Sequence, residues 1–302
     1  MTTTRGLAAL ALLLNAFTWG VSWWPFRRLQ DLGLHPLWAT ALIYLFALVC
    51  LTVLRPSAWR DFLQHRGLWT LLIASGLTNI GFNWAVTVGD VVRVVLLFYL
   101  MPAWVVLLAW PLLGERPNAT SLARLALALV GVVVVLKTPE SPWPWPQTLA
   151  DGLAVMGGFS FALTNVMLRR LHGAPTAASM LAMFGGGTLM AALAALLGVQ
   201  QGMVDGLPPL APAWLGWVGA LSVFFLVGNL GLQYGAARLS ASATSIIMLS
   251  EVVFASTSAV LLGAGELSPW VIAGGALIFL AALLSTVSLE KVPSSAQGGK
   301  LG

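Results

Sequence analysis

The sequence predicts an all-α membrane protein with ten transmembrane helices, arranged as two inverted five-helix repeats around a central cavity. Three observations predict this fold class: an apolar composition, a series of long apolar runs, and polar motifs that recur in the second half. Of the 302 residues, 59% are hydrophobic and 8% are charged, and the mean hydropathy is +0.90. Soluble domains carry about 25% charged residues. This chain therefore has too few charges to cover a surface that faces water.

The apolar runs are long enough to be membrane-spanning helices, because crossing roughly 30 Å of hydrocarbon takes about 20 residues. Ten such runs fall near residues 6–26, 36–54, 68–88, 93–113, 119–137, 150–170, 177–198, 213–236, 241–263 and 270–289. The first run resembles a signal peptide, but it continues to Trp24 without a convincing small-residue cleavage site. We expect it to remain as an uncleaved first helix.

The distribution of the fifteen Lys and Arg residues predicts the orientation, since basic residues accumulate in cytoplasmic loops. With the N-terminus inside, eleven lie in inner segments: Arg5, Arg55, Arg60, Arg66, Arg116, Arg124, Arg169, Arg170, Arg238, Lys291 and Lys300. The outer segments hold Arg27, Arg28, Arg93 and Lys137. We therefore expect a multi-pass membrane protein with both termini in the cytoplasm.

Motifs of the first half recur in the second half, on either side of the proline-rich stretch 138–148. At an offset of 150, Asn79-x-Gly81-x-Asn83-Trp84 aligns with Asn229-x-Gly231-x-Gln233-Tyr234. At an offset of 142, Phe17-Thr18-Trp19 aligns with Phe159-Ser160-Phe161, and Arg27-Arg28-Leu29 with Arg169-Arg170-Leu171. Chance similarity between glycine-rich apolar segments is the alternative explanation.

Five spans in each half is an odd number, so the second copy must be inverted in the membrane. We expect a first repeat at 1–137, a Pro-rich connection at 138–149, a second repeat at 150–290 and a disordered cytoplasmic tail at 291–302. Inverted repeats are a recurrent transporter architecture, with the substrate site near the midplane where the repeats meet.

Polar residues within the spans are the candidate lining of that site, because a polar side chain in lipid must face the bundle or a cavity. Residues three or four positions apart lie on one face of a helix. In the first span such a face is formed by Asn15, Thr18, Trp19 and Ser22. In the sixth span it is formed by Gly157, Ser160, Phe161 and Thr164, with Asn165 alongside. The third span aligns Asn79, Asn83 and Thr87, and the eighth aligns Ser222, Asn229 and Gln233. Hydrogen bonds between helices are the alternative role for these side chains.

Glu251 is the acidic residue that lies deepest within a predicted span, in a polar seam with Ser240, Thr244 and Ser258. It is a candidate proton carrier or a counter-charge for a substrate ammonium group; the alternative is a structural role against a neighbouring helix. Trp19, Tyr99 and Tyr234 lie deep beside the polar stripes and are candidates to contact a planar substrate. Pro102, within the fourth run, is a candidate kink or hinge.

Enzymatic motifs are missing from the sequence. It contains no HExxH, GxSxG or P-loop pattern, and the single Cys50 excludes an internal disulfide and a CxxC metal site. We therefore expect neither an enzyme nor a cofactor. Basic residues interleaved with aromatics are also missing, so we expect no nucleic-acid partner.

The chain resembles the drug/metabolite transporter superfamily of EamA type over essentially its whole length. The resemblance rests on Leu100-Met101-Pro102 and Gly114-Glu115-Arg116-Pro117 in the first half, and on Leu249-Ser250-Glu251, Gly265-Glu266-Leu267-Ser268 and Gly274-Gly275 in the second. The family pattern Leu-x-Glu-Pro is only partly kept, because Val252 follows Glu251 and Met101 precedes Pro102. Within the superfamily the chain looks most like the bacterial aromatic amino-acid exporters (the YddG-like group).

The resemblance implies a monomeric secondary transporter in contact with membrane lipid, which exports small metabolites by alternating access. Amino acids, aromatic or otherwise hydrophobic, are the expected substrates; broad-specificity efflux of drugs or lipophilic cations is the alternative. The candidate substrate-binding residues are Asn15, Trp19, Asn79, Asn83, Tyr99, Ser160, Thr164, Asn165, Asn229, Gln233, Tyr234, Thr244 and Glu251, with Pro102 as the hinge.

Overall fold

The computed structural model of the chain describes residues 2–114, 119–136, 146–171, 173–236, 238, 247, 250–264 and 268–287, and these residues form helices and short connections without a strand. The helices of the first half are α1 (Thr2–Val21), α2 (Trp23–Asp31), α3 (Pro36–Leu54), α4 (Ser57–Gln64), α5 (Gly67–Val88), α6 (Val91–Phe98), α7 (Met101–Leu113) and α8 (Ala119–Leu136). Those of the second half are α9 (Leu149–Arg170), α10 (Thr176–Gln200), α11 (Pro212–Ala236), α13 (Ser250–Leu261) and α14 (Pro269–Val287).

Seven segments of the described chain are long and apolar enough to cross a membrane: Gly6–Asp31, Pro36–Leu54, Gly67–Val88, Val91–Leu113, Leu149–Arg170, Thr176–Gln200 and Pro212–Leu232. Each of them coincides with a predicted span. The other three predicted spans coincide with shorter apolar helices at Leu125–Val134, Ser250–Leu261 and Pro269–Ala281. An all-helical chain with several candidate spans is thus confirmed, and the full set of ten stays a prediction.

Several helices begin where a side chain can accept a hydrogen bond from an otherwise unbonded backbone N–H group. The Asp90 carboxylate accepts from the Arg93 amide at 2.8 Å at the start of α6, and the Thr148 hydroxyl accepts from the Asp151 amide at 3.1 Å at the start of α9. The α3 helix begins with Pro36, which has no N–H group to leave unbonded, after a cap from His35.

Two of the candidate spans are interrupted. The first changes from α1 to α2 at Ser22, and the fourth changes from α6 to α7 at Tyr99–Leu100. The second interruption lies directly before Pro102, near the start of α7, where a proline fits because it lacks an N–H group. The side chain of Pro102 lies outside the described residues, and its role as a hinge stays a prediction.

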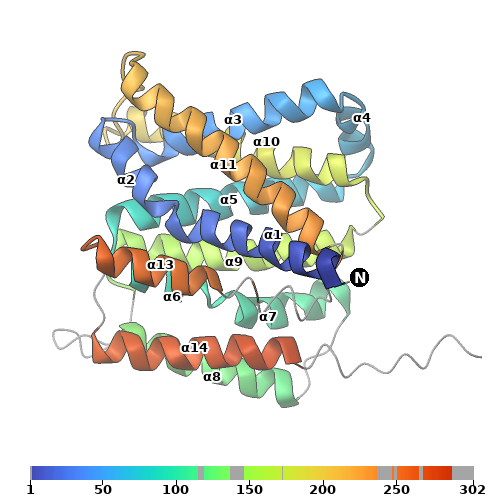
Figure 1. Cartoon of the computed structure of the whole chain (residues 1–302), viewed down its shortest axis with the longest axis vertical. Helices are drawn as coiled ribbons and strands as arrows, with labels where there is room; N and C mark the ends of the chain where they lie inside the picture. Colours follow the sequence, from blue (N-terminus) through green and yellow to red (C-terminus); the bar gives the residue numbers. More distant parts are fainter. Residues whose placement is uncertain are drawn as a thin grey trace, which may run out of the picture.

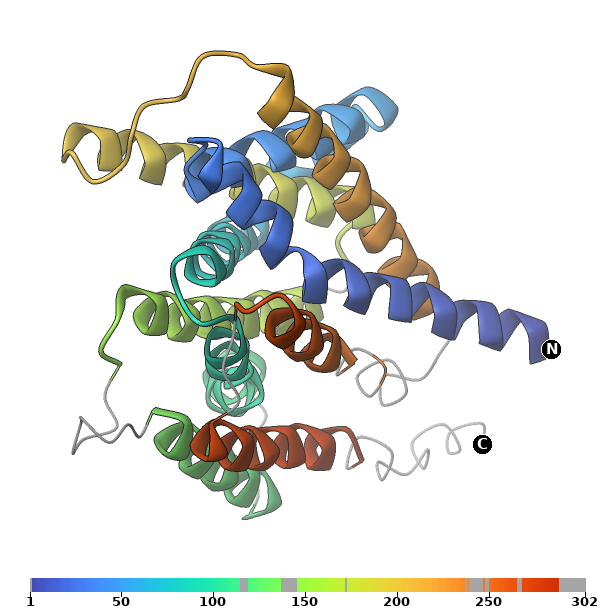
Figure 2. The same cartoon turned by 60° about the vertical axis from the view of Figure 1, so that its left-hand side comes forward.

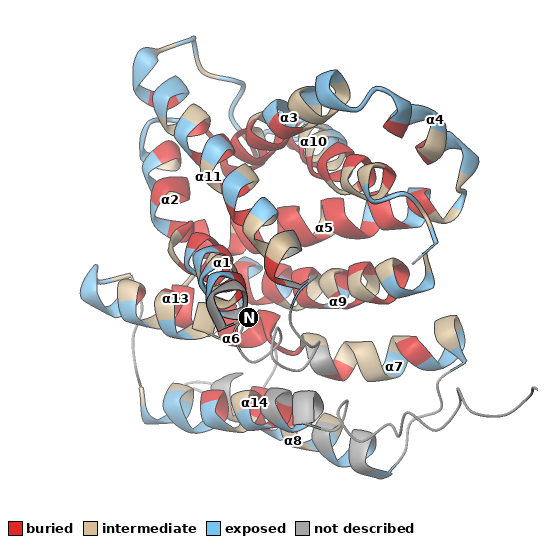
Figure 3. Cartoon of the chain, turned by 45° about the vertical axis from the view of Figure 1, so that its right-hand side comes forward, coloured by how far each residue is buried: buried red, intermediate tan, exposed pale blue. Residues whose placement is uncertain are grey.

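The helix α5 lies at the centre of the fold and packs on α9, α10, α3, α2 and α6. Figure 3 shows it coloured buried along much of its length. On one side of the molecule, α1 packs on α11 and α13. The pair α8 and α14 packs together at the periphery of the described fold, as Figures 1 and 2 both show.

Several helices approach one another closely at glycines. An added Cβ atom on Gly81 of α5 would lie 2.7 Å from the Leu153 carbonyl oxygen of α9. An added Cβ atom on Gly231 of α11 would lie 2.7 Å from the Ala11 carbonyl oxygen of α1. Lipid provides no hydrophobic drive for helices to associate, so membrane helices depend on close packing at small residues of this kind.

We predict that Gly81→Ala separates α5 from α9 and lowers the thermal stability of the detergent-solubilised protein, because overpacking costs typically about 1–3 kcal/mol. Gly152→Ala on α9 is the matched control, since an added Cβ atom there meets nothing within 4 Å. Thermal unfolding of both variants is the measurement. Equal melting temperatures for Gly81→Ala and Gly152→Ala would contradict the packing argument.

Candidate functional site

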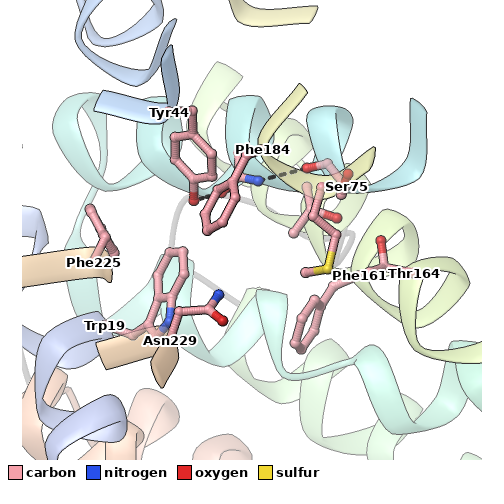
Figure 4. Close-up of a pocket in the computed structure, with 11 residues that line it drawn as sticks. Trp19, Tyr44, Ser75, Phe161, Thr164, Phe184, Phe225 and Asn229 are labelled. Atoms are coloured by element: carbon pink, nitrogen blue, oxygen red, sulfur yellow. Dashed lines mark hydrogen bonds between the residues drawn. The ribbon is translucent and has the colours of Figure 1, made fainter. Parts of the chain in front are cut away.

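A cavity of about 70 Å³ lies within the bundle between α1, α3, α5, α9, α10 and α11. It is lined by Trp19, Tyr44, Ser75, Thr78, Asn79, Phe161, Thr164, Met183, Phe184, Phe225 and Asn229. Figure 4 shows Trp19 and Asn229 on one side of this space, with Phe161 and Thr164 on the other. The lining thus comes from both halves of the chain.

Hydrogen bonds hold the polar part of the lining in place. The Tyr44 hydroxyl donates to the Asn79 side-chain oxygen, and the Asn79 amide nitrogen donates to the Ser75 carbonyl oxygen at 2.8 Å. Tyr44 lies on α3, whereas Asn79 and Ser75 lie one turn apart on α5. The pair therefore joins two helices and fixes the direction of the Asn79 amide at the cavity.

An aromatic cluster forms the remainder of one wall. The ring centroid of Phe225 lies 4.7 Å from that of Trp19 and 6.3 Å from that of Tyr44, and the Tyr44 ring lies 6.0 Å from the Phe184 ring. These separations are typical of favourable aromatic pairs. The cluster brings rings from α1, α3, α10 and α11 to one place.

None of the eleven lining residues is charged. The lining offers aromatic faces, hydroxyl groups and two amides, which suit a solute that has an apolar body and hydrogen-bonding groups without net charge. The volume of about 70 Å³ is well below the roughly 300–1,000 Å³ of typical ligand pockets. The cavity must widen to enclose a metabolite.

Four of the residues predicted from the sequence line this cavity: Trp19, Asn79, Thr164 and Asn229. Two of them, Asn79 and Asn229, are the amides that align between the halves at an offset of 150. Their binding to a substrate stays a prediction.

Most other predicted residues lie outside the lining and bond to neighbouring helices or to their own. The Asn15 amide donates to the Gly228 carbonyl oxygen at 2.8 Å, and the Asn83 amide donates to the Thr40 hydroxyl at 3.1 Å. The Asn165 amide donates to the Phe161 carbonyl oxygen at 3.0 Å. Ser160 is buried beside the cavity wall and accepts, through its carbonyl oxygen, from the Thr164 hydroxyl at 3.0 Å.

Glu251 also lies outside the cavity lining. It is in the first turn of α13, and one of its carboxylate oxygens accepts a hydrogen bond of 3.1 Å from the Tyr99 hydroxyl at the α6–α7 interruption. This contact links the fourth predicted span to the ninth. Tyr234 lies near the end of α11, with the Arg238 guanidinium carbon 3.7 Å from its ring centroid.

Two predicted site residues cannot be placed relative to the cavity. Thr244 and the side chain of Gln233 lie outside the described residues.

The lining residues that were not among the predicted binding residues are mostly aromatic: Tyr44, Phe184 and Phe225, with Ser75, Thr78, Phe161 and Met183. Two of them could have been found from the sequence, one from the repeat and one from helical spacing. Phe161 aligns with Trp19 at an offset of 142, and Ser75 lies one helical turn before Asn79 on the same face. Tyr44 lies in an almost uniformly apolar run, in which no polar stripe marks the inward face.

A second, more polar site lies at the end of the bundle where α2 and α5 terminate. A pocket of about 470 Å³ is lined there by charged groups that include Arg27, Asp90 and Arg93. The Arg93 guanidinium forms two hydrogen bonds with the Asp151 carboxylate, of 2.8 and 3.1 Å. The Asp151 side chain is only 2% exposed. This ion pair therefore joins the start of α6 to the start of α9, with the carboxylate almost fully covered and the guanidinium partly exposed.

A histidine lies near the same end. His35 is in the connection before α3, with its ring 5.2 Å from the Trp84 ring. Burial lowers the pKa of His35, and attraction to Asp205 opposes that shift. Within the described residues, no group of three His, Cys, Asp or Glu side chains is arranged to hold a metal ion.

We predict that Arg93→Ala destabilises the protein strongly, because it leaves the buried Asp151 carboxylate without its cation. Breaking a buried pair in this way costs roughly 3–5 kcal/mol. The matched control is Arg28→Ala, since Arg28 and Asp31 form an exposed pair at 3.6 Å and such pairs contribute only about 0–1 kcal/mol. Thermal unfolding in detergent compares the two. A melting temperature for Arg93→Ala as high as that of Arg28→Ala would refute the structural role of the ion pair.

Comparisons with known proteins extend these observations. A search of curated proteins finds no match. A crystal structure, described only as that of a protein, is 20% identical in sequence, with a TM-score of 0.59; the match covers 95% of this chain and 100% of the other. At this identity the likeness shows a shared fold alone. Residues 6–137 match the model of the EamA-like transporter family, so the first half of the chain is similar to a family of membrane transporters.

Proposed function

We propose that the protein is a secondary transporter of the EamA type, which exports small, net-uncharged metabolites across the bacterial inner membrane by alternating access. The match of residues 6–137 indicates a membrane transporter of small solutes. The substrate class we propose is amino acids with aromatic or other hydrophobic side chains.

The observation that carries the proposal is the correspondence between the two halves around the central cavity. At the offsets read from the sequence, Trp19 corresponds to Phe161 and Asn79 to Asn229, and all four line the cavity. A cavity on the axis that relates inverted repeats is where transporters of this architecture bind their substrates.

Contacts outside the cavity lining support the same correspondence. Gly81 corresponds to Gly231 and Leu153 to Ala11, and the two glycine-to-carbonyl contacts are equivalent at 2.7 Å for an added Cβ atom. The packing of the helices follows the same correspondence. The packed pair α5 and α9 corresponds to the packed pair α11 and α1, and α8 packs on its own counterpart, α14.

Two aromatic contacts are also counterparts of each other at these sequence offsets. The Phe17 and Phe254 rings meet edge to face with centroids 5.4 Å apart, and the Phe159 and Trp104 rings do so at 5.6 Å. The correspondence therefore extends from backbone contacts to individual side-chain pairs.

The chemistry of the lining supports an amino-acid substrate. The Asn79 and Asn229 amides can hydrogen-bond to amino and carboxyl groups, and the aromatic cluster can pack against an apolar side chain. A phosphate-bearing solute would require a Lys or Arg at the cavity, and the lining contains none.

Export of lipophilic cations is the second candidate, and Glu251 is the feature that favours it. Its carboxylate is the acidic group predicted to lie deepest in a span, although it bonds to Tyr99 outside the cavity lining. Such a carboxylate would attract a cationic drug only if the substrate path extended between α7 and α13.

The transport assay is counterflow in sealed proteoliposomes with labelled Phe, Trp, Met and Thr at two pH values. We expect saturable uptake for at least one of these amino acids, with preference for the aromatic ones. Absence of saturable uptake across a panel of amino acids and dyes would reject the transporter proposal.

We predict that Asn79→Leu raises the half-saturation concentration about tenfold or more, which corresponds to the loss of one hydrogen bond to a charged group. Asn83→Leu is the matched control: the same residue type, one turn later on α5, but bonded to Thr40 rather than lining the cavity. We expect Asn83→Leu to change stability and to leave the half-saturation concentration within about threefold. Equal effects of both variants would remove Asn79 from the binding site.

We predict that Glu251→Gln spares counterflow of neutral amino acids, since the glutamine side-chain oxygen can still accept from Tyr99. The same variant would abolish resistance to lipophilic cations if the protein were a drug exporter. Counterflow and growth in the presence of cationic dyes are the two measurements. If flux in the unchanged protein responds to an imposed pH gradient and that response disappears in Glu251→Gln, Glu251 is a proton site.

A further inference from the structure

Three hydroxyl groups in the cavity lining face a solute as hydrogen-bond acceptors. A hydroxyl group has one hydrogen to donate and two lone pairs that can accept. Ser75, Thr78 and Thr164 each donate that hydrogen to a carbonyl oxygen three or four residues earlier in their own helix, at 3.1, 2.8 and 3.0 Å. All three line the cavity, so the groups that they offer to a solute are lone pairs.

The hydroxyl hydrogen of Tyr44 is also committed, but to a side chain. Tyr44 donates to the Asn79 side-chain oxygen, and the Asn79 side-chain nitrogen donates to the Ser75 carbonyl oxygen at 2.8 Å. An amide nitrogen carries two hydrogens. One of them is used on Ser75, so the second is available to a solute in the cavity that Asn79 lines.

These two bonds fix which end of the Asn79 amide is the donor. If the amide turned over, its oxygen would meet the Ser75 carbonyl oxygen, and two acceptors would face each other. Tyr44 also strengthens the donor, because hydrogen bonds in a chain polarise one another. Asn79 therefore presents an N–H group to the cavity as long as the Tyr44 hydroxyl stays on its oxygen.

The ring of Tyr44 is held by residues of α10 and α11. Its centroid lies 6.0 Å from that of Phe184 and 6.3 Å from that of Phe225, and Figure 4 shows Tyr44 beside Phe184. Gly187 on α10 leaves room for this ring: an added Cβ atom would lie 2.7 Å from the Tyr44 Cγ atom and closer still to Cδ1. A side chain at Gly187 would therefore displace the ring and its hydroxyl group.

We propose that the cavity sorts the two charged ends of an amino acid, and that Tyr44 is the positioning residue for this selectivity. The carboxylate, which accepts hydrogen bonds, is held by the Asn79 N–H group that Tyr44 orients. The ammonium group, which donates them, is held by the hydroxyl oxygens of Ser75, Thr78 and Thr164. This assignment rests on the proposed function and adds to it the place of each end of the substrate.

The test is inhibition of counterflow by two analogues, each of which lacks one charged end. Proteoliposomes take up the labelled amino acid that the parent protein transports best. If that amino acid is Phe, one analogue is 3-phenylpropionate, which keeps the carboxylate, and the other is 2-phenylethylamine, which keeps the ammonium group. The inhibition constant of each analogue is measured for the parent and for every variant.

Tyr44→Phe should raise the inhibition constant of 3-phenylpropionate about fivefold, which corresponds to about one hydrogen bond. The constant of 2-phenylethylamine should stay within about twofold of the parent value, because the hydroxyl groups that hold an ammonium are unchanged. Thr78→Val, which removes one of those hydroxyl groups, should give the reverse pattern. A loss of packing alone would change both constants together. Equal changes for the two analogues in Tyr44→Phe, or no change in either, would overturn the role of Tyr44.

Variants of α10 test the support of the Tyr44 ring. Gly187→Ala should reproduce the pattern of Tyr44→Phe, because it displaces the ring. Gly185→Ala is the matched control on the same helix, since an added Cβ atom there lies 3.8 Å from Leu72 Cδ1, an ordinary contact. Both constants should then stay within about twofold of the parent values. Parent-like constants in Gly187→Ala would contradict the positioning of Tyr44 by α10.

A double variant tests whether Tyr44 acts through Asn79. In an Asn79→Leu background, Tyr44→Phe should change neither inhibition constant further, because two residues that act as one unit are not additive. A further fivefold rise for 3-phenylpropionate in that background would show that Tyr44 acts by another route, and would overturn the assignment.

The remaining outcomes separate this assignment from the proposed function. If Tyr44→Phe does not fold, Gly187→Ala answers the same question with the tyrosine in place. A parent without saturable flux of any amino acid rejects the proposed function, and the assignment with it. A parent that transports an amino acid, but whose two analogues respond alike to every variant, rejects only the sorting of the two ends.

Discussion

The close approach of helix backbones at glycine is the constraint on which the structure depends. Helices in lipid cannot gain from leaving water, so their association relies on contact between surfaces that fit. At Gly81 the carbonyl oxygen of Leu153 occupies the space that any other side chain would need. This contact sets α5 against α9, and α5 in turn positions Asn79 at the cavity. The distance between two backbones therefore decides where the Asn79 amide meets the cavity.

Composition and apolar run length were sufficient to predict an all-helical membrane protein, because lipid imposes both on any chain that crosses it. The seven long candidate spans fall where apolar runs of about twenty residues fall. The interruption at Tyr99–Leu100 was predictable only as a kink near Pro102. The short helix α4 lies in a polar connection, and a search for long apolar runs does not detect it, because its apolar residues lie on one face only.

The cavity was less predictable than the helices. A helical wheel identifies a polar face, but it does not say whether that face meets a cavity or another helix. Asn79 and Asn83 share a face of α5, and only the position of α3 separates them: Thr40 bonds to Asn83, while Tyr44 bonds to Asn79 beside the open space. The aromatic wall was missed for the same reason, since Phe184 and Phe225 lie in apolar runs whose inward face is set by helix pairing.

The uncharged lining of the cavity has an electrical consequence. The eleven residues around it carry no formal charge, so a zwitterion held there adds none to the part of the protein that surrounds it. The membrane potential does work only on net charge that moves through it, at about 2.3 kcal/mol per elementary charge for 100 mV. The loaded cavity would therefore carry the same formal charge as the empty one, so the membrane potential does no work on the proposed zwitterionic substrate itself.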